Sequence, residues 1–140
     1  VMPYIWRKLL ANASVNAIAA IVDMTGTELH SNPYIMEIIR QISVETANVA
    51  KAKNIWFAEL QNPFEYVEKA LIGVKDNKVS MLQDFLAGRR TEIDFINYAV
   101  VKEAEKLSIP VPFNKIVTYI IKAIEYKRFN IDEKKQKMTA

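Results

Sequence analysis

The sequence predicts an all-α protein, a compact bundle of about six helices. Apolar residues recur at the three- and four-residue spacing of a helix face, and no segment reads as a run of alternating strands. The 140 residues include only three glycines, and hydrophobic residues make up 51% of the chain, a share typical of a folded globular protein. A chain of this length fits one domain. We expect that domain to cover residues 1–127, with a charged tail at residues 128–140.

The first expected helix begins near the N-terminus. Pro3 suits a first helical turn, and the helix should run to about Val22. The segment Asp23-Met-Thr-Gly26 is then expected to stop it with a glycine cap. Because the positions of this helix are apolar nearly all round, we expect it to be buried.

Two further helices each follow an asparagine that can cap them. One begins at Pro33 and extends to about Lys53, and the other begins at Pro63 and ends near Gly73. In both, the proline occupies the first helical position, where its missing N–H costs nothing.

A polar region connects the next two expected helices. Asn77 is expected to cap a short helix that stops at Gly88. The segment Thr91-Glu-Ile-Asp94 resembles a capping box and is expected to open one long helix through Lys106.

The last expected helix follows a break in the chain. Two prolines within Ile109–Pro112 prevent helical geometry there, so the final helix should cover about Asn114 to Lys127. Between the helices, Trp56 and Phe57 are expected to fill the core.

The composition excludes several classes of site. With no cysteine, the chain can form no disulfide, thiolate nucleophile or cysteine-based zinc site. His30 is the single histidine, which excludes a multi-histidine metal site, and we expect it in a loop or cap. The net charge of +3 is mild and the basic residues show no aromatic interleaving, so no nucleic acid partner is expected. The most apolar stretch, Leu9 to Val22, is too short to span a membrane, and together these absences favour an intracellular, cytoplasmic protein.

Three polar side chains lie along the otherwise apolar first helix. Lys8, Asn12 and Asn16 are four residues apart and therefore share one helical face. Leaving such a group buried without a partner costs roughly 1–3 kcal/mol. Either other side chains or a polar ligand must therefore interact with them.

A second polar run extends from Ser80 to Asn97 and reads Ser-Met-Leu-Gln-Asp-Phe-Leu-Ala-Gly-Arg-Arg-Thr-Glu-Ile-Asp-Phe-Ile-Asn. The two segments resemble the C-terminal domain of the ketopantoate reductases (2-dehydropantoate 2-reductases). That family carries Lys-Leu-x-x-Asn-x-x-x-Asn near the start of this domain and Ser-Met-Leu-Gln-Asp…Gly-Arg-Arg-Thr-Glu-Ile-Asp-Tyr-Ile-Asn further on. The resemblance runs from about Trp6 to Lys127 and implies a fold similar to the C-terminal domain of 6-phosphogluconate dehydrogenase. Tyr98 departs from the pattern, because many relatives have glycine there.

The resemblance implies a role for each polar residue. Lys8 is implied as the general acid that gives a proton to the substrate's carbonyl oxygen. Glu92 is implied to hydrogen-bond the substrate hydroxyl and to orient it beside Lys8. Asn12, Asn16 and Ser80 are implied as contacts to the substrate's hydroxyl and carboxylate groups. We therefore expect Lys8 and Glu92, 84 positions apart, to approach one another across a cleft.

Each of these residues also has a purely structural interpretation. A lysine in the first turns of a helix can extend its ammonium to water, and buried asparagines usually hydrogen-bond neighbouring helices. Ser80 could cap its helix or be an exposed serine of the first helical turn, and Glu92 could interact with a helix dipole. Arg89 and Arg90 could pair with Glu92, reach cofactor phosphates or be solvated.

The function implied by the resemblance is NADPH-dependent reduction of 2-dehydropantoate, or a similar 2-keto acid, to pantoate in pantothenate and coenzyme A biosynthesis. A reductase of this family holds its nicotinamide cofactor with a strand–Gly-x-Gly-x-x-Gly–helix unit, but the three glycines here are far apart. We therefore expect the chain to be the second half of a two-domain reductase, inactive alone, with an N-terminal Rossmann domain as its partner and a homodimer as its assembly. The alternative is a non-enzymatic helical interaction or dimerisation module that kept the fold and lost the chemistry.

Overall fold

The computed structural model describes residues 1–130, and within them it contains helices and no strand, which confirms the predicted all-α class. The expected number of about six helices is close to the seven α-helices found in this part of the chain. The α-helices are α1 (Met2–Val22), α2 (Gly26–His30), α3 (Pro33–Ala52), α4 (Pro63–Val74), α5 (Ser80–Leu86), α6 (Asn97–Lys106) and α7 (Pro112–Glu125). Three shorter helical segments are η1 (Ala58–Gln61), η2 (Ile93–Phe95) and η3 (Tyr126–Asn130).

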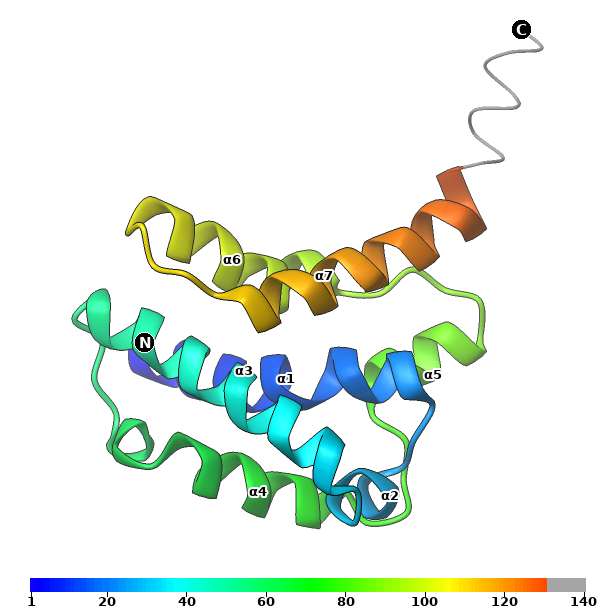
Figure 1. Cartoon of the computed structure of the whole chain (residues 1–140), viewed down its shortest axis with the longest axis horizontal. Coiled ribbons are helices and arrows are strands. Elements are labelled where there is room, and N and C mark those ends of the chain that lie inside the picture. Colours follow the sequence, from blue (N-terminus) through cyan, green and yellow to red (C-terminus); the bar gives the residue numbers. More distant parts are fainter. Residues whose placement is uncertain (131–140) are drawn as a thin grey trace, which may run out of the picture.

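Helix α1 lies in the middle of the bundle and contacts α3, α4, α5, α6 and α7 (Figure 1). Its second half, from Ala13 to Ala20, is buried throughout. Its first turns are different, because Tyr4, Ile5 and Lys8 are exposed. The expectation that the whole helix is buried therefore holds only for the second half.

The two asparagine caps are confirmed. The side-chain oxygen of Asn32 accepts hydrogen bonds from the N–H groups of Tyr34 and Ile35, at 3.1 and 3.2 Å. The side-chain oxygen of Asn62 accepts one from Glu65 N–H at 3.3 Å. These bonds satisfy N–H groups that have no partner inside the helix, and α3 and α4 begin where the sequence predicts.

The predicted glycine cap of α1 is wrong. Asp23 takes the left-handed conformation at the helix end, with φ of 53°, and Gly26 begins the unpredicted helix α2. A capping box opens α2, since Thr25 and Glu28 exchange side-chain to backbone hydrogen bonds.

Gly26 is needed for a close approach of two backbones. A Cβ atom on Gly26 would lie 2.7 Å from the carbonyl oxygen of Lys75, and the Gly26 N–H donates to the carbonyl of Asn77.

The prediction that Asn77 caps α5 is wrong. Its side chain donates to Val74 O instead, and Val79 is the residue that precedes α5.

The predicted single helix from Thr91 to Lys106 is also wrong. The hydroxyl of Thr91 accepts from Ile93 N–H, and a short 3-10 segment, η2, follows. At Ile96 the backbone leaves helical geometry, with φ of −116° and ψ of −103°, and α6 begins only at the next residue.

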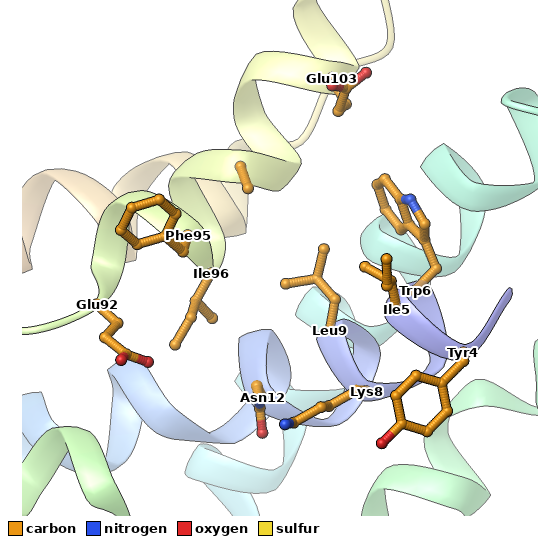
Figure 2. Close-up of a pocket in the computed structure, with 11 residues that line it drawn as sticks. Tyr4, Ile5, Trp6, Lys8, Leu9, Asn12, Glu92, Phe95, Ile96 and Glu103 are labelled. Carbon is orange, nitrogen blue, oxygen red and sulfur yellow. The ribbon is translucent and has the colours of Figure 1, made fainter. Parts of the chain in front are cut away.

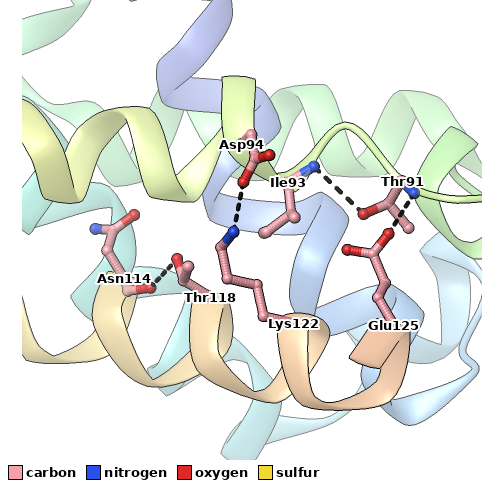
Figure 3. A network of polar contacts seen from close by, with 7 residues as sticks. All are labelled: Thr91, Ile93, Asp94, Asn114, Thr118, Lys122 and Glu125. Atoms are coloured by element: carbon pink, nitrogen blue, oxygen red, sulfur yellow. Dashed lines mark hydrogen bonds and ion pairs between the residues drawn. The ribbon is translucent and has the colours of Figure 1, made fainter. Parts of the chain in front are cut away.

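Helix α7 begins two residues earlier than expected, with Pro112 in its first turn. Its side chains contact the segment that precedes α6 (Figure 3). Lys122 Nζ lies 2.7 Å from Asp94 Oδ1, and the Glu125 carboxylate accepts from the Thr91 N–H at 2.8 Å. The helical path continues through η3 to Asn130, so residues 128–130 of the expected tail are helical, and the rest of that tail lies outside the described residues.

Trp56 and Phe57, which lie between α3 and η1, differ in their exposure to solvent. Phe57 is buried as expected, but Trp56 is 58% exposed, so its predicted place in the core is wrong. His30 is the last residue of α2 and Ser31 is the cap, so its expected loop or cap position is wrong by one residue. Its Nε2 lies 3.2 Å from Glu68 Oε2. Among the described helices none is long and apolar enough to cross a membrane.

We predict that Gly26→Ala destabilises the fold by roughly 1–3 kcal/mol, because the added methyl group meets rigid backbone. Gly73→Ala is the matched control, since a Cβ there has nothing within 4 Å. Gly73 lies in the last turn of α4, so that second change should leave the stability unchanged or raise it by up to about 0.5–1 kcal/mol. Urea denaturation of both variants measures the difference, and equal effects would contradict the close-approach explanation.

Candidate functional site

A cavity of about 500 Å³ opens between the first turns of α1 and the segment from Glu92 to the start of α6 (Figure 2). Lys8, Asn12 and Glu92 are among its lining residues. Most of the remaining wall is apolar and consists of Ile5, Trp6, Leu9, Phe95, Ile96 and Ala99. The cavity therefore presents a few polar groups on an otherwise apolar surface, as small-molecule sites commonly do.

The two walls are far apart in sequence. Lys8 and Asn12 line the cavity from α1, and Glu92 lines it from the other wall, just before η2 (Figure 2). Lys8 and Glu92 are exposed, and Asn12 is half-buried. This placement agrees with the expected approach of Lys8 and Glu92 across a cleft, and it leaves both groups accessible to a ligand.

Ser80 lies in an adjoining smaller cavity of about 170 Å³. Glu92 and Ile96 line both cavities, so Ser80 is connected to the main site through them. Ser80 is the first residue of α5, and the preceding Val79 occupies the cap position. Ser80 is therefore not the cap residue, but it is exposed in the first helical turn, as the other structural interpretation expects.

Asn16 is not brought to the cavity. It is 8% exposed, within the buried half of α1, and is absent from the lining of the cavities that hold Lys8, Asn12 and Ser80. The spacing of four residues does place Asn16 on the same helical face as Lys8. Neighbouring helices cover that face at the level of Asn16, which the sequence pattern could not show.

A third hollow, of about 210 Å³, flanks Lys8 and Asn12 on another side of α1. Arg7 and Tyr66 line it, and the Arg7 guanidinium lies 5.3 Å from the centre of the Tyr66 ring. Arg7 also pairs with Glu59. Lys8 and Asn12 therefore stand between two hollows, and the sequence analysis did not anticipate the second.

Glu103 is another lining residue that the sequence analysis missed. Its carboxylate lies 2.7 Å from Lys53 Nζ and 3.2 Å from Lys106 Nζ. The hydrogen bond from Lys53, followed by that from Lys106, holds the pKa of Glu103 below its ordinary value. No sequence signal marks this residue, because Lys53 approaches it from a different helix.

The two arginines of the second motif make contacts outside the cavity. Arg89 Nε lies 3.2 Å from Asp84 Oδ1, and the Arg90 guanidinium lies 4.9 Å from the centre of the Phe129 ring. Tyr98, the departure from the family pattern, lies between the ammonium groups of Lys102 and Lys122, 5.0 and 4.4 Å from its ring centre. It therefore packs between α6 and α7 and is not a lining residue of the cavity.

Within residues 1–130, no group of three or more acidic or histidine side chains is arranged to hold a metal ion. The polar groups of the cavity are the ammonium of Lys8, the amide of Asn12, the carboxylates of Glu92 and Glu103 and the hydroxyl of Tyr4. Such groups suit hydrogen bonding to an organic ligand with oxygen atoms.

Residues 1–125 match the family model described as the C-terminal domain of PanE/ApbA ketopantoate reductase. A 2-dehydropantoate 2-reductase of Pyrobaculum aerophilum is 37% identical over 123 residues, which make up 88% of this chain and 43% of that protein. The chain thus spans less than half the length of the curated relatives it matches.

Two solved structures show the same fold. The PanE/ApbA family ketopantoate reductase from Ralstonia eutropha JMP134 superposes with a TM-score of 0.78 at 27% identity, over 88% of this chain and 41% of that one. A D-mandelate dehydrogenase, in a ternary structure with NADH and anilino(oxo)acetate, superposes with a TM-score of 0.83 at 25% identity, over 91% of this chain and 53% of that one.

We predict that Glu103→Gln destabilises the protein at pH 7 by about 0.5–1 kcal/mol, because Lys53 loses its charged partner. The pKa of Glu103 is lowered by folding, so the carboxylate stabilises the fold fully above its unfolded-state pKa and loses this effect as the pH falls through the lowered value. The difference between wild type and variant should therefore shrink as the pH falls below 4.5, the ordinary pKa of a glutamate side chain.

Unfolding free energies measured by denaturant titration across this pH range test the prediction. The exposed neighbour Glu105 provides the control, since Glu105→Gln removes a charge from the same helix away from Lys53. If Glu103→Gln lowers the free energy of unfolding by the same amount at every pH, the proposed ion pair is contradicted.

Proposed function

The chain belongs to the family of ketopantoate reductase C-terminal domains, and from this we propose that it is the substrate-binding half of a two-domain oxidoreductase that reduces a 2-keto acid to a 2-hydroxy acid. The observation that carries the proposal is that Lys8, Asn12 and Glu92 share one cavity although Glu92 is distant in sequence. A non-enzymatic interaction module gives no reason for this arrangement. We propose 2-dehydropantoate as the substrate, with a place in pantothenate synthesis.

The chemistry requires a hydride for the carbonyl carbon and a proton for the carbonyl oxygen. A nicotinamide cofactor, which we propose to be NADPH, supplies the hydride when it is bound. The residues of this chain fit a site that a second domain completes, because Tyr4, Ile5 and Phe95 expose apolar surface around the cavity, with Phe95 80% exposed. We propose that an N-terminal domain of the Rossmann type covers this rim and holds the cofactor.

In this proposal Lys8 delivers the proton. Its ammonium donates a hydrogen bond to the carbonyl oxygen and transfers the proton as negative charge develops there. Asn12, one turn further along α1, donates from its amide to the same substrate and helps to fix its orientation. Glu92 accepts a hydrogen bond from a substrate hydroxyl on the opposite wall, and Ser80 donates to the substrate carboxylate from the adjoining cavity.

Self-association is a further part of the proposal. Helix α7 exposes Ile116, Tyr119 and Ile120, which recur at helical spacing and form an apolar face. A two-fold homodimer through such a face would be the commonest kind of soluble oligomer.

We predict that Lys8→Ala in the full-length protein lowers kcat by roughly 10²–10⁴-fold, the usual contribution of a positioned proton donor. The measurement is the loss of NADPH absorbance on addition of 2-dehydropantoate, with NADH as a comparison. Lys115→Ala, a change at an exposed lysine on α7, is the control and should leave kcat unchanged. An unaltered rate in Lys8→Ala would show that Lys8 has only a structural role.

We predict that Ser80→Ala raises KM several-fold while the melting temperature stays within about 1–2 °C of wild type. The reason is that Ser80 is exposed and does not occupy the cap position of α5. Thermal unfolding and steady-state kinetics on the same preparation separate the two effects. A fall in thermal stability with an unchanged KM would favour a structural role for this serine.

A further inference from the structure

Asn97 lies directly behind the main cavity. It is the first residue of α6, its side chain is fully buried, and it follows the backbone break at Ile96. Ile96 itself lines the cavity, and so does Asn12 on the opposite wall. The immediate neighbours of these two lining residues, Asn97 and Ala13, are the residues that connect the walls.

The side-chain amide of Asn97 forms the hydrogen bonds of this connection. Asn97 Nδ2 donates to the backbone carbonyl of Ala13 at 2.9 Å and to Asn114 Oδ1 at 3.0 Å. The first bond joins α6 to α1, and the second joins α6 to α7. Both partners belong to the buried interior, where a hydrogen bond is stronger than at the surface.

The orientation of Asn97 is determined by its partners. Asn114 donates to Glu45 Oε1 through both its backbone N–H, at 2.9 Å, and its side-chain Nδ2, at 3.0 Å. Phe113 N–H donates to the other oxygen of the same carboxylate at 2.9 Å. Because the amide nitrogen of Asn114 is thus directed at Glu45, its oxygen faces Asn97 and can only accept. Ala13 O can also only accept, so Asn97 must present its nitrogen to both.

This arrangement leaves Asn97 Oδ1 buried with no hydrogen-bond partner, and it is the only buried side-chain atom in that condition among residues 1–130. An unsatisfied buried polar atom is unfavourable by roughly 1–3 kcal/mol. An apolar side chain of similar volume would remove this unsatisfied atom, but it would leave the buried Asn114 Oδ1 without its donor. The donor side of the Asn97 amide therefore satisfies Asn114 and also joins α6 to α1.

We propose that Asn97 is a positioning residue that sets the spacing between the two walls of the cavity, an inference that rests on the proposed function. Without its bridge to Ala13, the wall that carries Glu92 keeps its bonds to α7 through Thr91 and Asp94. Its position over α1 then depends on apolar packing, which is less directional than a hydrogen bond. The separation between the ammonium of Lys8 and the carboxylate of Glu92 then varies. A displacement of about 1 Å in a reacting geometry can cost about 10²-fold in rate.

The first test measures the wall spacing itself. The chain has no cysteine, so Tyr4→Cys and Phe95→Cys accept one spin label each, on opposite walls of the cavity. Double electron–electron resonance on the labelled 140-residue chain gives the distance distribution between them. Asn97→Leu, which keeps the volume and removes the donor, should broaden or lengthen this distribution, and Asn97→Ala should do the same.

Thr118→Val is the matched control. Thr118 is equally buried and belongs to the same region, but its hydroxyl donates within α7 to the carbonyl of Asn114 (Figure 3). Its removal should leave the distance distribution unchanged. If Asn97→Leu also leaves the distribution unchanged while circular dichroism shows it folded, the positioning role is overturned. An equal broadening in Thr118→Val would overturn it as well.

The second test measures the consequence for the reaction in the full-length protein. Asn97→Leu should lower kcat by about 10- to 100-fold with KM changed less than about 3-fold, because it alters geometry rather than a substrate contact. Thr118→Val should keep the wild-type kcat. A wild-type protein without 2-keto acid reduction would overturn the proposed function, whereas a normal kcat in Asn97→Leu would overturn the positioning role alone.

Discussion

Small side chains along the second half of α1 are the constraint on which the rest of the structure depends. Ala13, Ser14, Ala17, Ala19 and Ala20 are all buried, and small side chains let neighbouring backbones approach closely. One helix can therefore contact α3, α4, α5, α6 and α7 at once. The hydroxyl of Ser14 stays satisfied in this crowded position by donating to the carbonyl of Leu10. The direction of α1 is fixed by this packing, and with it the point at which its first turns emerge.

Exposure to solvent falls along α1, which explains why Lys8 and Asn12 line the cavity and Asn16 does not. Lys8 is exposed, Asn12 is half-buried and Asn16 is buried, although all three share one face. Lys8 and Asn12 line one wall of the cavity and Glu92 lines the other, so a ligand in the cavity would lie between them. Asn16 lies where the neighbouring helices have already closed over the face. The burial of each residue therefore depends on how the other helices pack. The four-residue spacing shows only that the three side chains share one face of α1.

Features of the fold that depend on neighbouring residues in sequence were predictable. The caps at Asn32 and Asn62 are formed by bonds within three residues, so the starts of α3 and α4 follow from the local sequence. Helix α2 was missed although its capping box at Thr25 and Glu28 is local. Other missed features depend on partners far away in sequence. Gly26 is required by the backbone near Lys75, and the break at Ile96 precedes a side chain whose hydrogen-bond partners lie on α1 and α7.

At the candidate site, too, some residues were predictable from the sequence and others were not. Family resemblance predicted Lys8 and Glu92 as candidate site residues, because each lies within a recognisable run of residues. The apolar wall and Glu103 could not be identified in this way, since Lys53 and Phe95 reach their places through the packing of α3 and η2. Polar residues in a motif can be read from a sequence, whereas the cavity that surrounds them is a property of the folded chain.

The most direct test of the central claim is a crystal structure of the full-length protein with the oxidised cofactor and a 2-hydroxy acid bound. The account predicts that Lys8 Nζ lies within hydrogen-bonding distance, about 2.7–3.2 Å, of the oxygen on the carbon that exchanges hydride. It also predicts that Glu92 approaches the same ligand from the opposite wall. A ligand bound away from this cavity, with Lys8 directed into solvent, would contradict the assignment of the site.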